Sequence, residues 1–262
     1  MRKPGSIPLA AAAVLLATCI GASAQQHIVR VAAAADLKFA LTEVAHQFEE
    51  RTGTKVAATF GSSGNFFSQI QNGAPFDIFF SADVEYPRKL AAAGIADSAS
   101  LYEYAIGRIV VWTPYDSTTD VSRDRWNVLL DASVQKVAIA NPQHAPYGRA
   151  AVAAMQKAGV YERVKPKLVY GENISQAAQF VQSGSAQAGI IALSLALSPP
   201  MKGGKYWLIP DDEHDAIAQG AIILRSAKNK DGAATFLEFV RSPAGRDILS
   251  RFGFQLPSPG KN

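Results

Sequence analysis

Short apolar runs alternate with helical patterns along this chain, and the alternation restricts it to few folds. Residues 28–35, 55–60 and 76–80 are apolar runs of strand length. Between the first two runs, Leu37 to Phe48 carries apolar residues at the spacing of one helical face. This order of strand and helix predicts an α/β protein with mostly parallel sheets flanked by helices.

The same alternation restarts in the second half of the chain. Apolar runs at 137–140, 167–170 and 188–192 are separated by helical patterns. We therefore expect a second lobe with its own sheet. The polar stretch 114–126 is expected to be a surface loop.

The segment Gly61 to Asn65 (GSSGN) lies between a predicted strand and a predicted helix. Such a corner directs backbone N–H groups and the hydroxyls of Ser62 and Ser63 at one place. The first N–H groups of a helix have no partner inside it, and the helix dipole is positive there. The corner is therefore a candidate anion site. Asp36 also follows a predicted strand, and in parallel sheets ligands bind at the carboxyl ends of the strands.

The N-terminus has the three parts of a targeting segment. Arg2 and Lys3 are positive, Leu9 to Ile20 is apolar, and Ala22 to Ala24 forms a small-x-small cleavage site. This predicts a cleavable signal peptide over residues 1–24 and export to the periplasm. The apolar core is shorter than the ~20 residues that span a membrane. The alternative is a lipoprotein acylated at Cys19, which the preceding threonine disfavours.

Charge and cysteine content exclude several classes of protein. Cleavage would lower the 26 basic residues to 24 by removing Arg2 and Lys3, against 22 acidic residues. No basic stripe with interleaved aromatic residues is present, so nucleic-acid binding is not expected. Cys19 is the single cysteine, so the mature chain would have neither a disulfide nor a cysteine metal site.

Five stretches, taken in their order and spacing, resemble the periplasmic molybdate-binding proteins of ABC importers, within the type II solute-binding family. The resemblance covers essentially the whole mature chain. The stretches are VAAAADLKFAL (31–41), TFGSSGNFFSQIQNGAPFDIFFSAD (59–83), YAIGRIVVW (104–112), ANPQHAPYG (140–148) and GENISQA (171–177).

The resemblance implies a two-lobed type II periplasmic-binding-protein fold with the ligand cleft between the lobes. Lobe 1 would comprise 27–107 plus 217–262, and lobe 2 would comprise 108–216. The implied function is capture of molybdate, and of tungstate, and delivery to an inner-membrane ABC permease. By the same resemblance we expect a monomer that is not an enzyme and needs no cofactor.

In that family, neutral donors hold the oxyanion, and no protein atom binds the molybdenum itself. By position, the resemblance implies a corner at Ala35 and Asp36, the hydroxyl and N–H of Ser63, and the backbone N–H groups of Tyr147 and Ile174. Neutral donors suit a buried dianion, because its lost hydration must be replaced by many hydrogen bonds.

Asp36 departs from the family pattern, which has serine or Thr-Asn at that corner. A carboxylate facing a dianion would be repulsive. One interpretation makes Asp36 an N-cap for the N–H groups of residues 38 or 39. The other makes it the acceptor of a proton from a protonated oxyanion such as hydrogen phosphate, so binding of phosphate or another oxyanion is an alternative function.

Two further alternatives belong to other classes of protein. A serine hydrolase would need a histidine near Ser63, and only His144 lies at a predicted carboxyl-end corner. The GSSGN corner does not match the GxSxG motif of hydrolases. The acidic stretch 211–215 could bind a metal, although such a charge run is more often a solvated connector.

Overall fold

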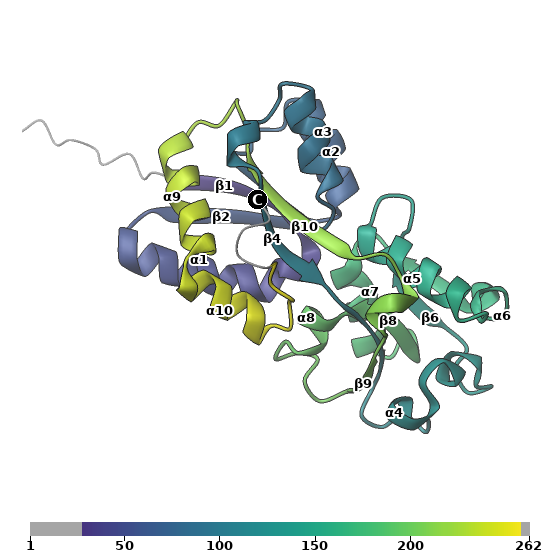
Figure 1. Cartoon of the computed structure of the whole chain (residues 1–262). Helices are drawn as coiled ribbons and strands as arrows, with labels where there is room; N and C mark the ends of the chain where they lie inside the picture. Colours follow the sequence, from purple (N-terminus) through teal and green to yellow (C-terminus); the bar gives the residue numbers. More distant parts are fainter. Residues whose placement is uncertain (1–27, 258–262) are drawn as a thin grey trace, which may run out of the picture.

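The computed structural model describes residues 28–257, which form two five-stranded sheets flanked by helices (Figure 1). The strand order is β2-β1-β3-β10-β4 in the first sheet and β7-β6-β8-β5-β9 in the second. The strands of the first sheet are β1 (Ile28–Ala34), β2 (Lys55–Gly61), β3 (Ile78–Ser81), β4 (Tyr102–Gly107) and β10 (Ile217–Ile223). Those of the second are β5 (Ile109–Thr113), β6 (Val137–Ala140), β7 (Leu168–Gly171), β8 (Ala188–Ala192) and β9 (Lys205–Leu208).

In each sheet, four strands run in one direction and one runs against them. The antiparallel strand is β10 in the first sheet and β5 in the second. These two strands are the ones that the chain enters after crossing from the other sheet, since β5 follows β4 and β10 follows β9. The predicted α/β fold with mostly parallel strands and two lobes is therefore confirmed.

The helices cover the sheets and bury a separate core in each lobe. In lobe 1, Phe48, Phe80 and Phe236 pack edge to face and have no exposed surface. The helices of lobe 1 are α1 (Lys38–Thr52), α2 (Ser63–Gln71), α3 (Glu85–Ala92), α9 (Lys230–Arg241) and α10 (Pro243–Arg251). Those of lobe 2 are α4 (Val121–Asp124), α5 (Pro146–Lys157), α6 (Tyr161–Val164), α7 (Ile174–Gln182) and α8 (Leu193–Ala196).

The polar stretch after β5 is not a simple loop, which corrects the sequence-based expectation. Its second part forms the short helix α4, followed by a 3₁₀ segment at Arg125–Leu130. The Asp120 carboxylate caps α4 by accepting N–H groups of Ser122 and Arg123. A polar run that begins with an aspartate cap can thus be helical once Val121 finds a buried position.

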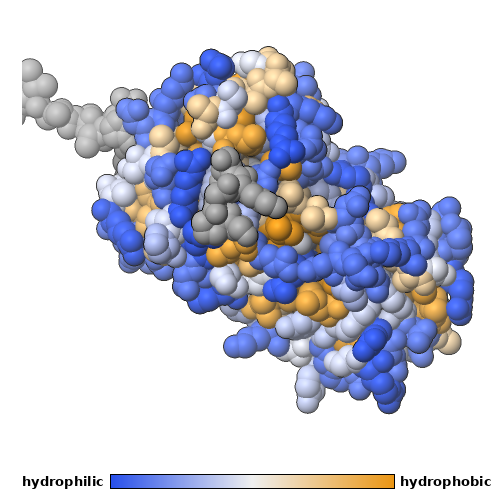
Figure 2. Space-filling view, in the orientation of Figure 1, coloured by the Kyte–Doolittle hydropathy of each residue, from blue (hydrophilic) through white to orange (hydrophobic). Residues whose placement is uncertain are grey.

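The predicted signal peptide and Cys19 lie outside the described residues. Between residues 28 and 257, no helix combines the length and the hydrophobicity needed to cross a membrane. On the face shown in Figure 2, hydrophilic residues predominate and hydrophobic ones form separate small groups.

Candidate functional site

All five residues that the sequence singles out line one small cavity between the lobes. Ala35, Asp36 and Ser63 come from lobe 1, and Tyr147 and Ile174 come from lobe 2. Each of the five side chains is at most 3% exposed. The remaining lining residues are Ala34, Gly61, Ala82, Ala145 and Pro146.

Strand ends bring these residues together. Ala35 follows β1, Ser63 lies just beyond β2, and Ala82 follows β3, so three neighbouring strand ends of lobe 1 face the cavity. In lobe 2, the segments after β6 and β7 lead into α5 and α7. The cavity therefore lies at the carboxyl ends of strands from both sheets, where α/β proteins bind ligands.

Ser63 is the first residue of α2, and its hydroxyl lies inside the cleft. The Oγ accepts the backbone N–H of Ala82 at 2.9 Å. A serine hydroxyl has one proton to donate besides its acceptor lone pairs. Ser63 can therefore give both its O–H and its helix-start N–H to an anion.

The residues from lobe 2 occupy the first turns of two helices. Tyr147 follows Pro146 at the start of α5, and Ile174 is the first residue of α7. The Asn173 side chain caps α7 by accepting the N–H of Gln176 at 3.1 Å. Backbone N–H groups in a first turn have no partner within the helix, so both helices present neutral donors. None of the described residues lining this cavity is a lysine or an arginine.

Asp36 contributes a carboxylate that accepts two side-chain hydrogen bonds through one of its oxygens. Its Oδ2 accepts the Tyr147 hydroxyl at 2.9 Å and the Gln219 amide at 2.8 Å. Gln219 in turn accepts the Tyr104 hydroxyl at 2.7 Å on its Oε1. Burial raises the pKa of Asp36 to about 6, although the bonds from Gln219 and Tyr147 oppose this shift. Asp36, Tyr147, Gln219 and Tyr104 are called the Asp36 network below.

The N-cap interpretation of Asp36 is wrong. Ala35–Leu37 forms a 3₁₀ turn, α1 begins only at Lys38, and no side chain caps either segment. The carboxylate instead accepts charge-assisted hydrogen bonds from Tyr147 and Gln219 inside the cleft, and the nearby N–H groups of Asp36 and Leu37 also lower its pKa. Tyr147 therefore contributes its hydroxyl as well as the helix-start N–H that the resemblance implies.

Gln219 and Tyr104 were not among the site residues predicted from the sequence. Gln219 is a fully buried amide in the otherwise apolar strand β10, and Tyr104 is a fully buried phenol in β4. A polar residue inside an apolar run is a recognisable signal, but its partner Asp36 is 183 residues away. Gly107 completes this arrangement, because a Cβ at that position would collide with the Tyr147 hydroxyl.

The lobes are in contact across the cleft, so the described state is closed. Ser194 and Ser175 of lobe 2 donate to the carbonyls of Asp36 and Ala35, both at 2.8 Å. At the rim, the Gly64 N–H donates to the His144 carbonyl at 3.0 Å. A side chain at Gly64 would collide with that carbonyl, which explains the glycine.

The hydrolase and metal alternatives find no support in this geometry. The His144 ring lies 3.0 Å from the hydroxyl of Ser62, not of Ser63, and Ser62 donates its proton to the His144 carbonyl at 2.6 Å. In the part of the chain that the structure describes, no three His, Cys, Asp or Glu side chains group as metal ligands would. Within 211–215, Glu213 instead accepts the Trp126 indole N–H at 2.7 Å.

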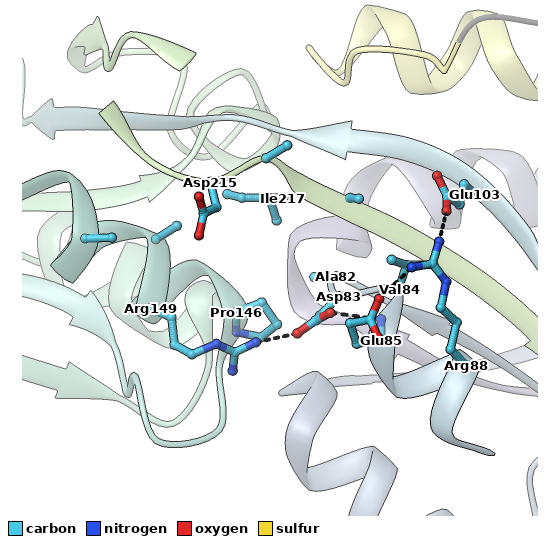
Figure 3. A pocket seen from close by; sticks show the side chains of 14 residues that line it. Ala82, Asp83, Val84, Glu85, Arg88, Glu103, Pro146, Arg149, Asp215 and Ile217 are labelled. Atoms are coloured by element: carbon cyan, nitrogen blue, oxygen red, sulfur yellow. Dashed lines mark hydrogen bonds and ion pairs between the residues drawn. The ribbon is translucent and has the colours of Figure 1, made fainter. Parts of the chain in front are cut away.

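A larger groove of about 640 Å³ adjoins the cavity, sharing Ala82 and Pro146 with it (Figure 3). Its arginines are already paired. Arg149 reaches Asp83 across the cleft at 2.5 Å, and Arg88 lies between two glutamates at 2.6 Å from each. Four carboxylates against two arginines make this groove unfavourable for an anion, so the small cavity between the lobes is the candidate site. The four carboxylates of the groove belong to Asp83, Glu85, Glu103 and Asp215.

Comparison with known proteins identifies the family of this chain. Residues 29–255 match the family model described as bacterial extracellular solute-binding protein. The molybdate-binding protein ModA of Azotobacter vinelandii is 38% identical over 238 residues, which is 90% of this chain and 93% of that protein. ModA of Rhodobacter capsulatus is 36% identical over 251 residues, covering 96% and 97%.

Structural comparison gives the same result. The periplasmic molybdate-binding protein of Azotobacter vinelandii superimposes with a TM-score of 0.82 at 32% identity, covering 87% of this chain and 99% of that one. The family resemblance predicted from the corner motifs is thereby confirmed. The chain belongs to the bacterial extracellular solute-binding proteins, a family of transport components and not of enzymes.

Proposed function

We propose that this protein is the substrate-binding component of a molybdate importer and captures the tetrahedral oxyanion in the cavity between its lobes. The observation that carries the proposal is that residues with neutral donors from both lobes line one small cavity. The names of its relatives in Azotobacter vinelandii and Rhodobacter capsulatus support molybdate as the ligand.

Neutral donors are suited to an anion that must be released again. A buried dianion regains its hydration energy from fixed N–H and O–H dipoles, which need no reorganisation when it binds. A buried lysine or arginine would leave an uncompensated charge after release. Donors that surround the anion from two lobes also favour a closed state with ligand bound and an open state without it.

Three parts of the proposal follow from family membership. The cavity would accept tungstate, which has the same charge and shape as molybdate. The protein would act in the periplasm and pass its ligand to an ABC permease in the inner membrane. Selectivity against sulfate would come from cavity size, because sulfate shares the charge and the tetrahedral shape.

Calorimetric titration tests the ligand. Purified protein, stripped of bound anion, is titrated in turn with molybdate, tungstate, sulfate and phosphate. We expect tight one-to-one binding of the first two alone. Absence of molybdate binding at every pH between 5.5 and 8 would refute the proposal.

The Ser63→Ala variant tests the site. It removes one hydrogen bond to a charged group, which is typically about 1.5–3 kcal/mol. We expect molybdate affinity to fall roughly 10- to 100-fold, and the protein to stay folded with a modestly lower thermal stability, because the Ala82 N–H loses its acceptor. Ser68→Ala is the matched control, because Ser68 is exposed on the same helix. Equal affinity of both variants would remove Ser63 from the site.

The Asp36 carboxylate in the cavity favours a second candidate function, capture of a protonated oxyanion such as hydrogen phosphate. An ionised Asp36 would accept the proton that such an anion carries. Asp36→Asn separates the two candidates, since it would weaken phosphate binding while preserving or strengthening molybdate binding.

A further inference from the structure

The Asp36 carboxyl group is asymmetric. Its Oδ2 has two donors, from Tyr147 and Gln219. Its Oδ1 is buried and has no hydrogen-bond partner anywhere in residues 28–257. The residue is 1% exposed and lines the cavity beside Ser63 and the start of α7. The backbone N–H groups of Asp36 and Leu37 lie near this carboxyl and lower its pKa, but neither makes a hydrogen bond to Oδ1, so no side chain offers that oxygen a proton.

An ionised carboxylate at this place is incompatible with a dianion in the same cavity. Like charges in a buried site disfavour each other, and the group that can become neutral takes up a proton. A carboxylic acid with its proton on Oδ1 is, in contrast, a hydrogen-bond donor. In that form Asp36 would match the other neutral donors of the site.

The groups packed around Asp36 do not offer another way to neutralise it. Tyr147 faces it from α5, Tyr104 and Gln219 belong to β4 and β10, and Ser63 and Ser194 approach from α2 and α8. Burial and the neighbouring carboxylate raise the pKa of both tyrosines well above 10, so both stay protonated. No lysine, arginine or histidine among the described residues makes a hydrogen bond or ion pair with Asp36.

We propose that Asp36 binds the oxyanion as a neutral carboxylic acid, donating from Oδ1, and that capture of each dianion takes up one proton from solution. The inference rests on the proposed function of the same cavity. No bond to the anion is made or broken; the proton moves from water to the carboxylate. The Tyr147 and Gln219 bonds keep Oδ2 as the acceptor and so direct the proton to Oδ1.

The proposal makes Asp36 a specificity-determining residue. A fully deprotonated dianion needs the proton on Asp36, whereas hydrogen phosphate brings its own and would be bound by the ionised carboxylate. Net proton uptake on binding therefore distinguishes the two modes. The raised pKa of Asp36, about 6, makes protonation accessible near neutral pH.

The test is calorimetry with molybdate in buffers of different ionisation enthalpy between pH 5.5 and 8.5. The slope of binding enthalpy against buffer enthalpy gives the number of protons taken up. We expect a value of roughly a quarter at pH 5.5, where Asp36 is already mostly protonated, that rises towards one at pH 8. Affinity should fall by up to roughly tenfold per pH unit above pH 6.

Two variants test whether Asp36 is the group that takes up the proton. In Asp36→Asn the side-chain oxygen can still accept from Tyr147 and Gln219, and the amide presents N–H groups in place of the acid proton. We expect this variant to bind molybdate without proton uptake and, at pH 8, more tightly than the parent protein. His144→Gln is the control, because His144 is another ionisable side chain and lies at the rim of the same cleft. It should retain the proton uptake.

Each other outcome contradicts the inference in a recognisable way. Tight molybdate binding without proton uptake at pH 8 would overturn it and leave the proposed function standing, as would uptake that persists in Asp36→Asn or disappears in His144→Gln. Phosphate binding that is lost in Asp36→Asn, with no molybdate binding, would overturn both and identify Asp36 as an ionised acceptor.

Discussion

The two sides of the cleft are built by different means. Lobe 1 contributes mainly side chains, the Ser63 hydroxyl and the Asp36 carboxyl; the latter accepts from Gln219, which itself accepts from Tyr104. Lobe 2 contributes mainly helix starts, at Tyr147 and Ile174. A side chain can be replaced by one mutation, but a backbone N–H survives every substitution except proline. The lobe 1 side can therefore tune selectivity, and the lobe 2 side supplies donors that tolerate sequence change.

The largest expected effect concerns the Asp36 side chain on the lobe 1 side of the cleft. It is a change in the free energy of unfolding of the ligand-free protein. Asp36 has a pKa of about 6 when folded, against 3.8 for the unperturbed group. Between these two pH values the folded state binds more protons than the unfolded state. The contribution of Asp36 to the free energy of unfolding therefore falls as the pH rises from 4 to 6 and is constant above pH 6. The loss is about 3 kcal/mol for a shift of this size.

Asp36→Asn removes this dependence. We expect the variant to exceed the parent protein in unfolding free energy by up to about 3 kcal/mol above pH 6.5, with a smaller difference near pH 4. Urea unfolding at a series of pH values measures it. Asp116→Asn, at an exposed aspartate, should show no such trend. A parent protein whose stability relative to Asp36→Asn is constant across this range would contradict the assignment.

Proline at position 174 tests the backbone side of the cleft. Ile174 is the first residue of α7, where proline is tolerated, and Asn173 before it is extended at φ −147° and ψ 177°. Ile174→Pro therefore removes one N–H while the helix remains. We expect molybdate affinity to fall roughly 10- to 100-fold, since a hydrogen bond to a charged group is lost.

Ile174→Val is the matched control, because it retains the N–H and most of the packing. Its affinity should stay within a few-fold of that of the parent protein. If the two variants bind molybdate equally well, the N–H of residue 174 does not contact the ligand. Lobe 2 would then not contribute a backbone donor at this position.

Tyr147→Phe tests the hydroxyl that lobe 2 contributes to the Asp36 network, which donates to Asp36 and accepts from Gln219. The hydroxyl favours the ionised carboxylate, so its loss should raise the pKa of Asp36 further. The carboxyl carbon shift of Asp36 in an NMR titration reports this directly. Tyr115→Phe, at an exposed tyrosine, should leave the titration unchanged. A lowered Asp36 pKa in Tyr147→Phe would show that the hydroxyl does not donate to the carboxylate.

The smallest effect is expected at the rim of the cleft. Arg149 pairs with Asp83 across the lobes, and their side chains are 41% and 25% exposed. Exposed ion pairs contribute about 0–1 kcal/mol, so Arg149→Ala should weaken binding no more than a few-fold. The effect should shrink with added salt. A loss as large as that of Ser63→Ala would mean that the rim, and not the cavity, holds the ligand.

Local pattern was sufficient for much of this protein. Apolar runs and helical periodicity depend only on residues that are close in sequence. The α/β class, the second lobe and the corners at Ala35, Ser63, Tyr147 and Ile174 could therefore all be predicted. The family resemblance then associated these corners with one site, and the structure brings all of them to one cavity. Helix starts are local features, and their donors follow from secondary structure alone.

Only the tertiary structure decided what Asp36 does. From the sequence, its carboxylate could have capped the adjacent helix, because the nearest N–H groups were the only partners in view. Folding brings Tyr147 from 111 and Gln219 from 183 residues away, and these contacts replace the local cap. The protonation of a buried carboxyl depends on such distant partners and on burial, neither of which neighbouring residues reveal.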